Sequence, residues 1–83
     1  MKGRFMKNAY QTNDFGLAST LLTLEYELIQ LDRTNPAKVL FIFNNAPGLE
    51  NVVAGFWNNS LCVPAQTLLS AQRNLKSRLY SNI

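Results

Sequence analysis

The segment Val39–Phe43 is apolar at every position, and it constrains the fold more than any other part of the chain. Side chains of a β-strand alternate between the two faces of a sheet, so Phe41 and Phe43 share one face. Leu40 and Ile42 then lie on the opposite face. A strand that is apolar on both faces is usually central in its sheet or buried by a partner. The sequence therefore predicts a central strand here.

A second segment rich in strand-forming residues, residues 26–31, precedes this one. The polar residues 32–37 separate it from the strand at residues 38–43. Two such segments joined by a short polar loop are typical of a β-hairpin. Residues 8–12 form a further short predicted strand at the beginning of the chain.

Apolar residues recur at helical spacing in three other segments, which predicts three amphipathic helices. The first is predicted at about 14–25, after the capping sequence Thr12-Asn13-Asp14. The second opens at Asn45-Ala46-Pro47, because proline suits the first helical turn, and ends at residues 58–59. The third is predicted at about 64–80. The three predicted buried stripes are Leu17, Leu21, Leu24 and Leu28; Leu49, Val52, Val53 and Phe56; and Ala65, Leu68, Ala71, Leu75 and Leu79.

The element order (β)αββαα predicts a small, single-domain α+β fold. A helical crossover between the first two strands leaves a gap that the third strand fills. We therefore predict a three-stranded antiparallel sheet in the order 1-3-2, with the helices packed on one face. Residues 8–83 are predicted to form one globular domain. Residues 1–7 are predicted to be a disordered N-terminal extension, with Met6 as an alternative start.

The composition excludes most enzyme chemistries. The 83 residues include no histidine, one cysteine and five acidic residues, so neither a histidine-dependent triad nor a zinc–thiolate site can be assembled. Glu25 and Glu27 are interpreted as solvated surface residues. We predict a protein that is not an enzyme, with no catalytic residue, metal, cofactor or small-molecule substrate. Cys62, inside the apolar run Leu61–Val63, is predicted to be a buried structural residue.

No apolar run approaches the roughly 20 residues that cross a bilayer. The basic N-terminal residues are not followed by the apolar region of a secretory signal. A cytoplasmic location without a membrane partner is the expectation.

Protein association is the leading functional hypothesis. Some apolar or aromatic residues are not assigned to a helical stripe, and they are the candidate interface: Leu40, Ile42, Trp57 and Tyr80. Aromatic residues are enriched at interface hot spots, and a domain this small often supplements its core by self-association. The hypothesis is a small interaction module that forms homo-oligomers or docks on a protein partner. For Trp57 itself, a core or core-edge position is the favoured interpretation, and an interface position is the alternative.

Nucleic-acid binding through the last helix is the alternative function. Eight Lys and Arg residues against five Asp and Glu residues give a net charge of +3, which steers weakly towards anions. The candidate contact residues are Arg33, Lys38, Arg73, Lys76 and Arg78. A connection of about six residues before the last helix is longer than the turn of a helix-turn-helix motif. Arg78 also lies on the opposite flank of that helix from Arg73 and Lys76.

Several short motifs together resemble a known family. They are Tyr10-x-Thr12-x-Asp14-Phe15-x-Leu17-Ala18, Phe41-x-Phe43, Phe56-Trp57-Asn58 and Leu75-Lys76-Ser77-x-Leu79-Tyr80. The pattern resembles a family of short bacterial and phage-type proteins classed as a domain of unknown function. The resemblance covers nearly the whole chain from residue 8 and implies no catalytic residue, with Lys76 as a charged residue to test. It also implies a glycine near the end of the first helix, where this sequence has Glu25.

Overall fold

The computed structural model describes residues 9–81 of the chain, and these residues form three strands and three helices. In chain order the elements are β1 (Ala9–Thr12), α2 (Phe15–Thr23), β2 (Leu28–Asp32), β3 (Leu40–Asn44), α3 (Leu49–Trp57) and α4 (Ala65–Ser81). The predicted small α+β fold is confirmed. The predicted extension at residues 1–7 lies outside the described residues.

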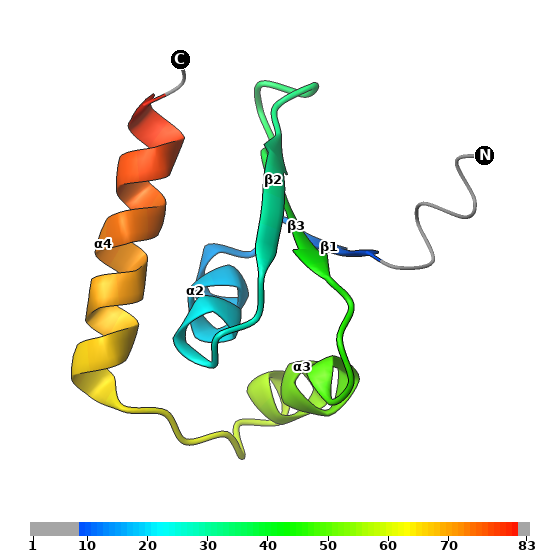
Figure 1. The fold of residues 1–83 in the computed structure, drawn as a ribbon, viewed down its shortest axis with the longest axis vertical. Helices are drawn as coiled ribbons and strands as arrows, with labels where there is room; N and C mark the ends of the chain where they lie inside the picture. The colour runs from blue at the N-terminus through cyan, green and yellow to red at the C-terminus, as the bar shows by residue number, and fades with distance from the viewer. Residues whose placement is uncertain (1–8, 82–83) are drawn as a thin grey trace.

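The sheet has the strand order β1-β3-β2, as predicted, and β3 pairs antiparallel with both neighbours. Figure 1 shows α2 and α4 on one side of this sheet, with α3 closing its lower end. Phe41 and Phe43 face this helical side and belong to the buried core. The central place of β3 therefore agrees with its apolar character on both faces.

A β-bulge in β2 sets which of its side chains reach the core. Leu28 pairs with Phe43 and Leu31 pairs with Phe41, but the register shifts between Leu28 and Gln30. In a regular strand, residues 28 and 31 would lie on opposite faces. The extra residue at the bulge, Ile29, restores the alternation. Both leucines consequently pack against the core, whereas Ile29 is 41% exposed.

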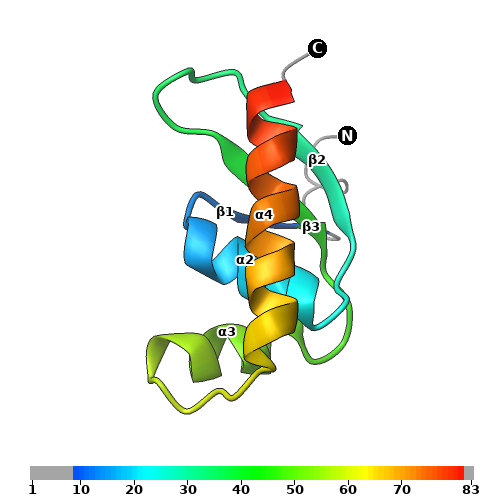
Figure 2. The same ribbon diagram turned by 90° about the vertical axis from the view of Figure 1, so that its left-hand side faces the viewer.

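Helix α2 is enclosed on nearly every side. It lies between the sheet and α4, and Figure 2 shows α4 in front of it. Ser19, Thr20 and Thr23 are buried together with its apolar residues. Their hydroxyls donate hydrogen bonds of 2.8 Å to the backbone carbonyls of Phe15, Gly16 and Ser19, respectively. These bonds offset the desolvation of three polar groups, so α2 can be central without an apolar surface all round.

The ends of α2 follow local capping rules. The Asp14 carboxylate is the N-cap and accepts a hydrogen bond of 2.8 Å from the backbone N–H of Leu17. At the other end, the N–H of Tyr26 donates to the carbonyl of Leu21, and the N–H of Glu25 donates to that of Leu22. This pair of bonds is a Schellman motif, and it needs a left-handed residue at position 25. The helix therefore ends at Thr23, earlier than residue 25, and Leu28 belongs to β2.

Replacing Glu25 with glycine is expected to stabilise the domain by about 1 kcal/mol. Glu25 has a φ of 70°, a conformation in which the Cβ of an L-residue is crowded. Chemical denaturation measures the change in the free energy of unfolding. The matched control is Glu25→Ala, which removes the carboxylate but keeps the Cβ. Equal stability of the two variants would contradict the explanation by backbone strain.

Helix α3 begins two residues later than the proline suggested. Pro47 precedes the helix, and the N–H of Leu49 donates to the carbonyl of Ala46 at 3.2 Å. Gly48 has a φ of 89°, so proline followed by a left-handed glycine has the composition of a type II turn. A Cβ at Gly48 would also lie 3.2 Å from the Tyr26 hydroxyl. This turn places Leu49, which is fully buried, at the start of the helix.

Helix α4 packs on α2 through Ala71 and Leu75, which are both buried. Leu79 is partly buried against the same core, as predicted. Ala65 was predicted in the buried stripe but is exposed, because it lies at the first position of the helix, more than one turn before Ala71, its first buried residue. Within residues 9–81, no helix combines the length and the apolar character needed to span a membrane.

Candidate functional site

The structure separates the residues that the sequence suggested as one protein interface. Trp57 ends α3 and Tyr80 lies in the last turn of α4, and Figure 1 places α3 and that end of α4 at opposite ends of the molecule. Leu40 and Ile42 lie on β3, on the face of the sheet opposite Phe41 and the core. The four residues therefore do not form one patch.

Ile42 is only 3% exposed, so its place in the candidate interface was wrong. It lies on the central strand, where Gln11 of β1 and Gln30 of β2 are paired with it on either side. Paired residues of neighbouring strands share one face, and long side chains there shield the residue between them. Leu40, at the beginning of β3, is half-buried.

Trp57 is 62% exposed, and its interpretation as a core or core-edge residue is therefore wrong. Its ring meets that of Phe56 edge-on, with 4.9 Å between the ring centroids and 84° between the planes. Phe56 in turn packs partly buried against the core. A Cβ at Gly16 would lie 3.5 Å from its Cζ, so the Phe56 ring lies against the first turn of α2. The exposed indole is thus supported by a side chain that the fold fixes.

The loop between α3 and α4 explains the incorrect prediction for Cys62, which is exposed. Leu61 and Val63 line a groove with Phe56 and Leu68. In an extended segment, neighbouring side chains point to opposite sides. Cys62 consequently points away from the groove that its two neighbours fill.

The five candidate nucleic-acid contacts are divided among different places. Arg73 and Lys76 line a groove of about 220 Å³ at the side of α4. Arg33 and Arg78 line another cleft, between β2 and the last turns of α4. Lys38 lies in the β2–β3 loop. No single basic surface collects all five.

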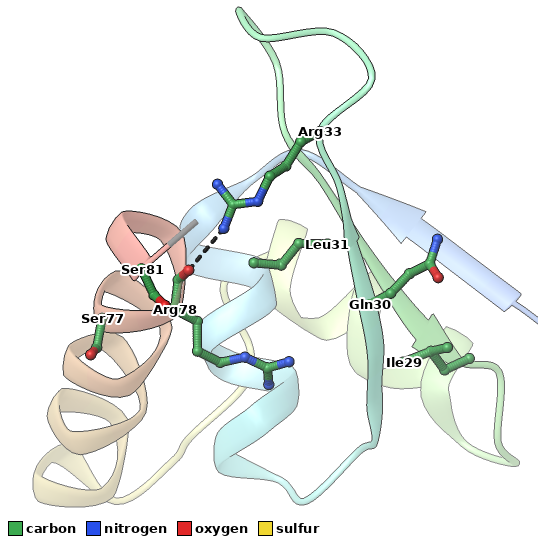
Figure 3. A pocket seen from close by; sticks show the side chains of 7 residues that line it. All are labelled: Ile29, Gln30, Leu31, Arg33, Ser77, Arg78 and Ser81. Atoms are coloured by element: carbon green, nitrogen blue, oxygen red, sulfur yellow. Dashed lines mark hydrogen bonds between the residues drawn. The ribbon is translucent and has the colours of Figure 1, made fainter. Parts of the chain in front are cut away.

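Arg33 has a structural role that the sequence did not reveal. Its Nη2 donates a hydrogen bond of 2.8 Å to the carbonyl of Arg78, and its Nη1 donates one of 3.0 Å to the carbonyl of Leu79. Figure 3 shows the side chain reaching from the end of β2 across to α4. The last carbonyls of a helix lack partners within it and carry partial negative charge, so a guanidinium suits this place. Arg33 therefore ties the β2–β3 loop to the end of α4.

Replacing Arg33 with glutamine is expected to lower the free energy of unfolding by about 1 kcal/mol, because both hydrogen bonds are exposed to water. The backbone amide hydrogens in the last turn of α4 should also exchange with solvent faster. Hydrogen exchange followed by NMR checks this effect. The matched control is Lys38→Gln in the same loop, which removes the same charge. An equal change in exchange for the two variants would show that charge, rather than the tie to α4, is responsible.

Two ionisable groups among the described residues have pKa values displaced from their ordinary values. Within residues 9–81, no group of three Cys, Asp or Glu side chains is placed to hold a metal ion. Hydrogen bonds from the side chain and backbone of Thr34 lower the pKa of Asp32. Burial and, to a lesser extent, the charge of Asp14 raise the pKa of Tyr10. Both shifts arise from local structure in a turn and at a strand, respectively.

Three residues of the Arg73–Lys76 groove were missed in the sequence. Phe15 and Leu69 line it together with Gln72, and Leu69 is 50% exposed. Leu69 could have been found from the sequence, because its spacing of four and seven residues from Arg73 and Lys76 places all three on one side of a helix. Phe15 lies on another helix, and only the packing of α4 on α2 brings it to the same groove.

A comparison with protein families finds a match over nearly the whole chain, including every residue that the structure describes. The matching family model is described as Domain of unknown function (DUF5659), and it covers residues 7–81. No curated protein and no solved structure matches.

Proposed function

We propose, starting from the fact that this chain belongs to the DUF5659 family, that it is a small, non-enzymatic protein-interaction module that self-associates through Trp57. The non-enzymatic part of the proposal is supported by the composition, because the chain has no histidine and one cysteine. The family description gives no activity that bears on the proposal.

The observation that carries this proposal is the exposure of Trp57. An indole that is 62% exposed leaves a large apolar area in water. Its contact with Phe56 restricts the ring before any partner binds, so less side-chain entropy is lost on association. Large, preorganised aromatic residues of this kind dominate many interfaces.

Replacing Trp57 with serine is expected to abolish self-association. Light scattering coupled to size-exclusion chromatography, over a series of protein concentrations, measures the mass. Because Trp57 is the single tryptophan, its fluorescence emission in the unaltered chain should also shift to longer wavelength on dilution, as the indole returns to water.

The matched control is Tyr80→Ser, which removes another exposed ring at the far end of α4. It should leave the oligomer intact. A monomer at all concentrations, or an oligomer unaffected by Trp57→Ser, would refute the proposed role of Trp57. Loss of the oligomer in the Tyr80 variant alone would place the interface on α4.

Nucleic-acid binding remains the alternative proposal, and the shared groove of Arg73 and Lys76 beside the Phe15 ring is what supports it. Cations next to an aromatic ring suit single-stranded nucleic acid. Alanine at Arg73 or Lys76 should then weaken binding about equally for different sequences and reduce its salt dependence. Binding that is unchanged in both variants would refute this alternative.

A further inference from the structure

Helix α4 presents a second face that nothing in the described chain covers. Leu69, Arg73, Lys76 and Tyr80 recur at the spacing that places residues on one side of a helix. Leu69 is 50% exposed and Tyr80 is 80% exposed, and both cations are exposed between them. We call these four residues the α4 stripe. It is separate from the face of α4 that buries Ala71 and Leu75.

The neighbouring helix widens the apolar part of the α4 stripe. Phe15, the first residue of α2, lines the same groove as Leu69. Its ring is partly buried against the core, which fixes it beside α4. The groove therefore has two apolar side chains, one from each helix. Its two cations follow Leu69 along α4, towards the C-terminal end of the helix.

The cations of the α4 stripe have no counter-charge on their own helix. The segment Ala65–Ser81 contains no Asp or Glu. Phe15 follows Asp14 directly, but an oxygen of that carboxylate is already engaged in capping α2. The stripe therefore offers positive charge at its centre and apolar side chains at both ends.

The charge pattern selects the occupant. A second copy of the chain is unsuitable, because an antiparallel or parallel pairing of two α4 stripes brings cations against cations. Nucleic acid is less suitable, because proteins that bind it usually gather more than two cations on one face. The stripe combines two central cations with apolar or aromatic side chains, Leu69 and Tyr80, at its ends. An amphipathic helix with central carboxylates and apolar residues on either side matches both features.

We propose that the α4 stripe, together with Phe15, binds an acidic amphipathic helical segment of another protein. This inference goes beyond the proposed self-association, because it concerns a different helix and a different partner. It would give the module two surfaces, Trp57 for a second copy and the α4 stripe for the partner.

The test is a titration of the isotopically labelled full chain, followed by NMR. The probe is a synthetic amphipathic helical peptide with glutamates at its central positions and leucines towards both ends of one face. A peptide with lysines in place of the glutamates is the charge control, and a short thymidine oligonucleotide tests the nucleic-acid alternative. We expect the acidic peptide to shift the signals of Phe15 and of the α4 stripe, and its affinity to fall as salt rises.

Three variants sharpen the test. Arg73→Glu should weaken binding of the acidic peptide by about tenfold or more, since it replaces an attraction with a repulsion. Arg78→Glu makes the same charge change on another face of the same helix and should change the affinity by less than about twofold. Trp57→Ser should leave peptide binding unchanged, which separates this inference from the proposed self-association.

Each contrary result would overturn the inference. Equal binding of the acidic and basic peptides would remove the charge argument. Shifts confined to other surfaces, or no shifts with the acidic peptide, would remove the assigned site. Tighter binding of the oligonucleotide, with the same residues shifted, would make the α4 stripe a nucleic-acid surface instead.

Discussion

Replacing Phe43 with alanine is expected to remove a large share of the stability of the domain. Removing a buried phenylalanine side chain costs about 3–5 kcal/mol, whereas a domain of this size has a total stability of about 4–12 kcal/mol. Phe43 is fully buried on the central strand. It is paired with Tyr10 on one side and with Leu28 on the other, so a cavity there weakens both halves of the sheet.

Urea denaturation followed by circular dichroism measures this loss. Because the alanine variant lacks a folded baseline if it is unfolded, Phe43→Leu provides a second variant with a smaller expected loss, about 1–2 kcal/mol. Tyr80→Ala is the exposed aromatic control and should stay within about 0.5 kcal/mol of the unaltered chain. A loss below about 1 kcal/mol for Phe43→Ala would mean that this residue is not at the centre of the core.

Replacing Leu75 with alanine is expected to lower the free energy of unfolding by about 2–5 kcal/mol. Leu75 is fully buried where α4 packs on α2, and it borders a groove with Leu22 and Thr23. The cavity would therefore open against the helix that joins the sheet to α4. The whole domain should still unfold in one transition if α4 belongs to the same cooperative unit.

Leu69→Ala is the matched control, because it removes the same side chain from an exposed position of the same helix. It should change stability by no more than about 0.5 kcal/mol. If Leu75→Ala produced two separate transitions, α4 would be a unit that detaches before the sheet and α2 unfold.

The parts of the fold that were predictable depend on local or periodic rules. The apolar run at 39–43 was sufficient to predict that β3 is central, because a strand that is apolar on both faces usually lies inside its sheet. Asp14 was recognisable as a cap because its side chain acts within one turn of α2. The stripe of Leu49, Val52, Val53 and Phe56 gave α3 and its buried side.

The incorrect or missing parts depend on contacts between distant segments. The bulge at Ile29 is needed because Leu28 and Leu31 both face the core, and the sequence alone allowed either register. The burial of Ile42 depends on partners from two other strands. The tie from Arg33 to α4 joins residues that are far apart in the chain, so no local pattern indicated it. The exposure of Cys62 likewise depends on Leu61 and Val63 filling the groove beside it, and that of Trp57 on Phe56 packing against the core.

The central position of β3 also has a consequence for the sequence of events during folding. β2 and β3 are joined by a short loop, so their hairpin is a local unit that can form within about 10 μs. In the chain, β1 is separated from β3 by both α2 and β2. Its pairing with β3 therefore closes a longer loop than the β2–β3 hairpin does, at a greater entropic cost. During synthesis, moreover, β1 has no partner until β3 has been made. The strand that is synthesised first is therefore expected to be the last to join the sheet.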